Sequence, residues 1–223
     1  MLFGDTQGCL PHPTNINMPI VFGYPESVKQ YQAEYEYLEI SRPGDCPKCQ
    51  VVGQMIGHGS YGRKVRDREQ AYQIRIRRWK CKACRRTISA LPDGVMRYRW
   101  YVTESIQEVL LQRYGEKQNW AGIAEQVGEA PHLRTMQRWC SAFEQRADVW
   151  LAWMARVLVE QDRGSVWLEE GGGERDGERL LKGALHLLGW AKGRWRELGE
   201  YGLADWLRFL WLWGWQQGLG RPV

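Results

Sequence analysis

The pattern of hydrophobic and polar positions changes from a period of two to a helical period near residue 102. Residues 72–77 read Tyr-Gln-Ile-Arg-Ile-Arg, and this alternation predicts a strand with one apolar face and one cationic face. The segment 51–56 is also strand-like, so we expect a hairpin whose long tip is the glycine-rich segment 57–62. A short apolar run at 19–22 indicates a further strand, and residues 25–28 could open a short helix.

Apolar residues recur at helical spacing throughout the second half of the chain. Thr103 and Asn119 are suitable N-cap residues for the first two helices, because their side chains can accept hydrogen bonds from the first turn. The expected helices span residues 103–114, 120–127, 132–146, 149–158, 180–191 and 203–215. Before the last two, the charged and glycine-rich segment 169–178 indicates a flexible linker or loop.

These patterns predict an α+β fold: a small β-hairpin zinc ribbon, then a mostly α-helical region resembling a helix-turn-helix, then Trp-rich C-terminal helices. We expect five parts, namely a lead-in at 1–44, the zinc ribbon at 45–101, the helical region at 102–160, a Gly-rich acidic linker or loop at 161–179 and the Trp-rich segment at 180–223. A hydrophobic content of 43% is typical of folded proteins.

Four of the six cysteines form two C-x-x-C pairs, which indicate a metal site. The pairs are Cys46 with Cys49 and Cys81 with Cys84, and the predicted hairpin lies between them. Two such turns supply the four thiolates that a structural zinc ion needs, so the expected cofactor is structural Zn²⁺. Four thiolates leave no coordination position for water, and we therefore expect no chemistry at this site. Cys140 is expected to pack within a helix and Cys9 to lie in the tail.

Positive charge is concentrated around this predicted ribbon. The chain has 31 Lys and Arg against 26 Asp and Glu, and between residues 63 and 99 there are 13 basic residues against three acidic ones. Clustered cations release counterions from phosphates, which favours binding to any nucleic acid. Aromatic residues are interleaved with the cations as Tyr72, Trp79, Tyr98, Trp100 and Tyr101. The candidate contacts here are Arg63, Lys64, Arg66, Arg75, Arg77, Arg85 and Arg86.

A second candidate surface lies in the third helix of the helical region. Helical spacing places Met136, Trp139 and Cys140 on its packing face. The opposite face carries His132, Arg134, Gln137 and Arg138. In a helix-turn-helix, side chains of this kind contact phosphates and base edges in the major groove. Six residues separate Gly128 from Thr135, which is about two more than the usual pattern allows.

Together these features resemble the N-terminal DNA-binding half of bacterial insertion-sequence transposases and a related uncharacterised bacterial zinc-ribbon family. The matching residues are Cys46-Pro-Lys-Cys49, Ile74-Arg-Ile-Arg-Arg78, Cys81-Lys-Ala-Cys84, Leu91-Pro92 and the Arg134 to Trp139 segment. The resemblance covers about residues 44–145. It implies a zinc-dependent protein that binds double-stranded DNA, acting as a truncated or accessory transposition factor or as a regulator.

We expect no enzymatic activity and no catalytic residues. Transposase chemistry belongs to a separate ribonuclease-H-like domain, and the residues after Trp150 show no strand-borne carboxylates of that kind. The residues also leave two alternatives to a DNA-binding function open: an RNA-binding zinc-ribbon protein and a protein-interaction adaptor. Nine of the 13 tryptophans occur from Trp150 onward, and the wide apolar surface of the last helix favours self-association or docking of a protein partner.

The sequence predicts no contact with a membrane. The longest uncharged run, 209–220, is shorter than the roughly 20 residues that a membrane helix needs. The N-terminus shows no secretory signal, so we expect a cytoplasmic location.

Overall fold

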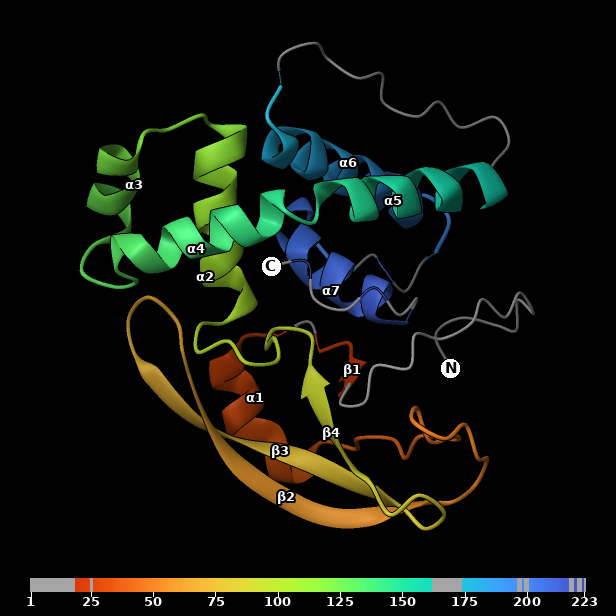
Figure 1. The fold of residues 1–223 in the computed structure, drawn as a ribbon. Coiled ribbons are helices and arrows are strands. Elements are labelled where there is room, and N and C mark those ends of the chain that lie inside the picture. The colour runs from red at the N-terminus through yellow and green to blue at the C-terminus, as the bar shows by residue number, and fades with distance from the viewer. Residues whose placement is uncertain are drawn as a thin grey trace. The chain divides into compact units, whose positions relative to one another are not determined.

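The computed structural model is a mixed α/β structure with two compact units (Figure 1). It describes residues 19–24, 26–161, 174–195, 198, 201–216, 219 and 222. Within these residues there are seven α-helices and one four-stranded sheet. The first unit comprises 1–102 with 211–220, and the second comprises 103–210 with 221–223.

The first unit is built on the sheet, whose strand order is β1-β4-β3-β2. The strands are β1 (Ile20–Phe22), β2 (Met55–Arg66), β3 (Ala71–Cys81) and β4 (Thr87–Pro92). β2 and β3 form a long, curved antiparallel hairpin (Figure 1). β4 pairs antiparallel with β3, and β1 pairs parallel with β4. The predicted hairpin therefore belongs to a larger sheet that also includes the short N-terminal strand.

The predicted position of the hairpin tip was wrong. Residues 57–62 lie inside β2, where the register with β3 shifts between Gly57 and Ser60. Gly59 has a φ of 69°, a conformation that glycine adopts without a steric penalty, so these glycines bend the strand instead of ending it. The true turn follows Arg66. Asp67 closes it, because its Oδ1 accepts hydrogen bonds of 2.8 Å from the backbone N–H groups of Glu69 and Gln70.

Helix α1 (Val28–Glu34) covers the part of β3 that β4 does not reach. The Ser27 side chain caps the helix by accepting a hydrogen bond from the Gln30 backbone N–H. β4 pairs only with residues 77–80 of β3, and the buried Tyr31 donates its hydroxyl to the Arg75 carbonyl at 2.9 Å. The buried face of β3, with Ile74 and Ile76, packs in the same cluster as Tyr31, as the alternation predicted.

The second unit is helical. Its helices are α2 (Thr103–Leu110), α3 (Trp120–Val127), α4 (Leu133–Glu144), α5 (Ala147–Gln161), α6 (Asp176–Lys192) and the first part of α7 (Trp206–Gln216). Asn119 caps α3 as predicted, since its side chain accepts a 2.9 Å hydrogen bond from the Gly122 backbone N–H. A π-helical turn, Leu111–Gly115, extends α2. α6 begins before the expected residue 180, and most of the predicted linker, 162–173, lies outside the described residues.

The apolar side chains of α7 are buried. Trp206, Phe209, Trp211 and Trp213 are all 9% exposed or less. The apolar surface that favoured self-association or a docked partner is therefore not exposed along these residues. The side chain of Trp215, near the end of α7, is not among the described ones. None of the described helices combines the length and the apolar character required to cross a membrane.

Candidate metal centre and basic groove

Two similar turns bring the four predicted cysteines together. In the first turn the Gln50 backbone N–H donates to the Cys46 carbonyl at 2.8 Å, and in the second the Cys81 N–H donates to the Arg86 carbonyl at 3.0 Å. Gln50 and Arg85 each follow the second cysteine of their pair directly, and both have left-handed backbone conformations, with φ values of 57° and 59°. This conformation reverses the chain so that both cysteines of a pair point the same way.

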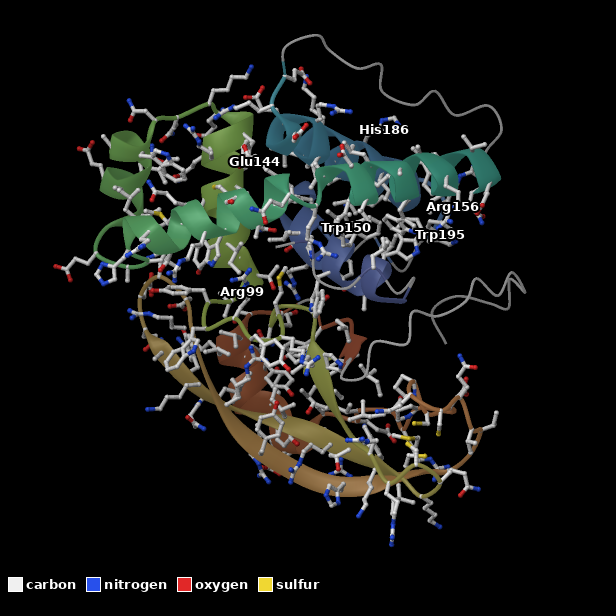
Figure 2. The ribbon with its side chains drawn as sticks, viewed as in Figure 1. Arg99, Glu144, Trp150, Arg156, His186 and Trp195 are labelled. Carbon is white, nitrogen blue, oxygen red and sulfur yellow. The ribbon has the colours of Figure 1, made fainter. Side chains whose placement is uncertain are left out.

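The four sulfur atoms can surround one metal ion. All lie within 4.8 Å of one another, near one end of the β2–β3 hairpin (Figure 2). The Cys46 and Cys84 sulfurs are 3.7 Å apart, and so are those of Cys49 and Cys81. A disulfide needs about 2.05 Å, whereas the sulfurs of a tetrahedral site with metal–sulfur bonds of about 2.3 Å are about 3.8 Å apart. The spacing therefore fits a tetrahedral metal site and excludes disulfides here.

The surroundings of the thiols differ within the first turn. Burial raises the pKa of Cys46 to about 12. Cys49 is only partly buried, and a hydrogen bond from the Val51 backbone N–H lowers its pKa to about 7. Metal ligation requires thiolates, so a bound cation would have to compensate for the burial of Cys46.

A basic groove with a volume of about 610 Å³ begins at the cysteine turns. Lys48 in the first turn and Arg86 after the second line one part of it, and the loop 97–100 after β4 lines another. Among the described residues its lining includes six cations, Lys48, Arg63, Lys64, Arg86, Arg97 and Arg99, and no carboxylate. Exposed aromatic rings of Tyr98 and Trp100 also border the groove.

Arg63 ties the loop to the sheet. Its Nη2 donates to the carbonyls of Met96 and Arg99, the latter at 2.7 Å, and burial lowers the pKa of its guanidinium. Arg99, labelled in Figure 2, lies in the same loop. Arg63 was predicted as a nucleic-acid contact, and the structure places its guanidinium against backbone oxygens inside the unit.

The other predicted cations of the hairpin are dispersed. Lys64 lines the groove, whereas the Arg66 guanidinium lies over the Tyr101 ring at 5.7 Å. Arg75 forms an ion pair with Glu36, and Arg77 lies over the Trp79 ring at 5.1 Å. Arg85 is exposed in the second cysteine turn, outside the groove lining.

On α4 the predicted packing face is buried. Met136, Trp139 and Cys140 are at most 3% exposed. The predicted contacts His132, Arg134, Gln137 and Arg138 are all exposed on the other side of the helix. Burial also raises the pKa of Cys140 to about 11, as expected for a packing residue that stays a neutral thiol.

The sequence analysis did not predict that one groove would be lined by Lys48, Arg97, Tyr98, Arg99 and Trp100. Their signal in the sequence is the alternation of arginine and aromatic residues at 97–100. Sequence spacing alone could not show that this segment returns to the first cysteine turn.

Residues 46–139 match a family described as a domain of unknown function, DUF6431. The matched part includes both cysteine turns, the hairpin, the loop 97–100 and most of α4. No curated protein and no solved structure matches the chain.

Proposed function

We propose that this protein binds DNA through the basic groove, and that a structural zinc ion orders the end of the groove formed by the cysteine turns. Four thiolates at tetrahedral spacing are the ligand set that zinc commonly takes in structural sites. The ion would join the two turns, and so hold Lys48 and Arg86 beside the sheet. The ion itself would take no part in chemistry, because four protein ligands close its coordination sphere.

The observation that carries the proposal is the composition of the groove lining, which in the part of the chain that the structure describes has six cations and no carboxylate. Lys48 and Arg86 are exposed and form no ion pair within the described residues. Cations of this kind remain available to a phosphate backbone, and each contact releases a condensed counterion. Arg75, by contrast, is already paired with Glu36 and contributes less.

α4 supports a second, helix-turn-helix-like contact. α3 ends at Gly128, whose φ of 80° turns the chain, and α4 then presents Arg134, Gln137 and Arg138 on its exposed face. Arginine can bind guanine and glutamine can bind adenine at base edges in the major groove. The turn between α3 and α4 is longer than that of the usual motif. We therefore propose that α4 contacts DNA and assign no individual base pair to any of its side chains.

The proposal includes no catalytic step. Glu178 and Asp205, two carboxylates of the second unit, form ion pairs with Arg175 and Arg208. Such pairs explain the position of both carboxylates without a catalytic metal.

The test is fluorescence anisotropy of the full chain with a labelled duplex DNA at about 50 and about 200 mM salt. Replacing Lys48→Ala together with Arg86→Ala should raise Kd about tenfold and reduce the salt slope by about two. The matched control is Lys29→Ala with Lys82→Ala, which removes two exposed charges of the same unit from outside the groove lining. This control should change Kd less than about twofold.

A third variant, Arg134→Ala with Arg138→Ala, measures the contribution of α4 and should also flatten the salt slope. A wild-type chain that holds its metal but shows no salt-dependent binding would contradict the proposed function. Equal losses in the groove variant and its charge-matched control would remove the groove from the interface.

A further inference from the structure

Two large aromatic side chains beside the groove are exposed to solvent. Tyr98 is 72% exposed and Trp100 is 69% exposed. Among the described tryptophans, Trp100 alone belongs to the exposed residues, whereas most of the others are buried. Exposed aromatic rings next to clustered cations are a common arrangement in proteins that bind single-stranded nucleic acids, because every base has a face on which such a ring can stack.

The loop that carries these rings is anchored at several points. The Arg66 backbone N–H donates to the Trp100 carbonyl at 2.7 Å, and Arg63 donates to the carbonyls of Met96 and Arg99. Val95 and Met96, which begin the loop, are buried. Tyr98 has a left-handed backbone conformation with a φ of 59°, which is uncommon for a residue with a side chain. The rings therefore project from backbone that is already held in place, so binding would order little further chain.

Cations line the groove beside these rings. The Arg97 guanidinium lies over one face of the Tyr98 ring, 4.2 Å from its centroid, so a base could stack only on the other face, and Lys48 and Arg86 line the same groove. The groove has a volume of about 610 Å³, in the range of pockets for small ligands, so unpaired bases could enter it whereas an intact duplex could contact only its rim. Bases inside an intact duplex are stacked on both faces, so these rings could stack only on bases that are unpaired.

Resting on the proposed function, we propose that the groove holds an unpaired DNA strand. Bases stack on Tyr98 and Trp100, and the adjoining phosphates contact Lys48, Arg86 and Arg97. The preferred substrate is then DNA that carries a single-stranded segment, such as a duplex with an overhang. This substrate class is narrower than DNA in general.

The test compares three labelled DNA probes by anisotropy with the full chain at one salt concentration: a blunt duplex, the same duplex with a thymidine overhang of about six nucleotides, and the single strand alone. The overhang probe should bind at least about fivefold more tightly than the blunt duplex, since each stacked base contributes about 5- to 150-fold in affinity. Trp100→Leu and Tyr98→Leu should each remove most of this preference, so that the overhang probe and the blunt duplex bind with similar Kd. Trp100→Phe should retain most of it.

The matched control is Tyr37→Leu, which replaces an aromatic side chain that is 89% exposed and lies outside the groove lining. It should keep the preference for the overhang. Metal content and thermal unfolding of each variant should equal those of the wild type, because the replaced rings are exposed.

Three outcomes overturn this inference and leave the proposed function standing. They are equal binding of blunt and overhang probes, a preference that survives both leucine variants, and displacement of the overhang by free thymidine monophosphate at concentrations comparable to the strand. Tighter binding of an RNA strand than of the DNA strand would overturn the assignment to DNA. Absence of binding to all three probes would overturn the proposed function as well.

Discussion

Arginine side chains have different structural roles in this protein, and a buried arginine has a different role from an exposed one. Arg208 is 2% exposed, and its Nη1 lies 3.4 Å from Glu104 Oε1 and 3.6 Å from Asp205 Oδ1. Such a buried charge is maintained because carboxylates neutralise it. Arg63 donates to backbone carbonyls and fixes a loop. Arg86 is exposed and unpaired within the described residues, which leaves it available to a ligand.

Glu178 provides a test of electrostatics at the level of one residue. It is 7% exposed, its Oε1 accepts a 2.9 Å hydrogen bond from Arg175 Nε, and Lys117 Nζ lies 3.5 Å from its Oε2. The hydrogen bond from Arg175 holds the pKa of this carboxyl below its usual value of 4.5. A lowered folded-state pKa means that the stabilisation is present above the unfolded-state pKa and is lost as the pH falls through the folded-state value.

We therefore expect Glu178→Gln to lower the free energy of unfolding by about 1 kcal/mol at pH 7. The expected loss is small because Arg175 and Lys117 are exposed to solvent, which weakens their electrostatic interactions with Glu178. The difference between variant and wild type should shrink as the pH falls below 4.5. Urea denaturation between about pH 3.5 and pH 7 measures this. A difference that stays constant across that range would show that the loss has no electrostatic origin.

At the scale of elements, α6 packs its first turn against the π-helical turn that follows α2. A Cβ atom added to Gly177 would lie 2.3 Å from Cε1 of the Tyr114 ring. This ring has little room to move, since Tyr114 is 3% exposed and donates its hydroxyl to the Cys140 carbonyl at 3.1 Å. The absence of a side chain at Gly177 therefore determines how closely the two elements approach.

Gly177→Ala should destabilise the protein by about 1–3 kcal/mol because it overpacks this contact. Gly189→Ala in the same helix is the control: a Cβ there meets no atom within 4 Å, and the higher helix propensity of alanine should stabilise by about 0.5–1 kcal/mol. Chemical denaturation of both variants gives the comparison. If the two alanines had the same effect, close packing at Tyr114 would not be the cause.

Local signals predicted most elements correctly, whereas pairings between distant segments were missed. Asn119 caps α3 as its side-chain chemistry predicted. The glycines of 57–62 were misread as a turn, because glycine also permits a bulge within a strand and only the partner strand decides between these. The parallel pairing of β1 with β4 joins segments far apart in the chain, and no local pattern specifies it.

At the scale of the whole molecule, the candidate site likewise has one part set by local sequence and one part set by contacts between distant segments. Spacing alone was enough to predict the cysteine cluster, because each C-x-x-C pair forms a local turn and four thiols suit one ion. The groove could not be predicted in full, because it depends on the loop 97–100 lying beside Lys48. The pairing of Glu36 with Arg75, outside the groove, is likewise a contact between distant segments. Composition identified the cationic region, but it could not show which of its charged side chains remain available to bind a ligand.

Metal binding should be coupled to folding of the first unit. The ligands come from two turns separated by the whole β2–β3 hairpin, so one ion would close a long loop of chain. Cys81→Ser should therefore abolish stoichiometric zinc binding and lower the thermal midpoint, measured by elemental analysis and by circular dichroism. Cys140→Ala, which changes a buried cysteine outside the cluster, should retain one zinc ion per chain. A Cys81→Ser protein without zinc and with the wild-type midpoint would refute the coupling.

The short strand β1 has a practical consequence for work on the matched region. It pairs with β4 from Ile20 opposite Ala90 to Phe22 opposite Pro92, and both β1 and α1 precede residue 46, where the family match begins. A polypeptide limited to residues 46–139 would leave β4 with unpaired backbone groups and would uncover the apolar residues that pack around Tyr31. Uncovered strands and apolar patches of this kind promote aggregation. Expression of the first unit in soluble form therefore requires the N-terminal segment in the recombinant product.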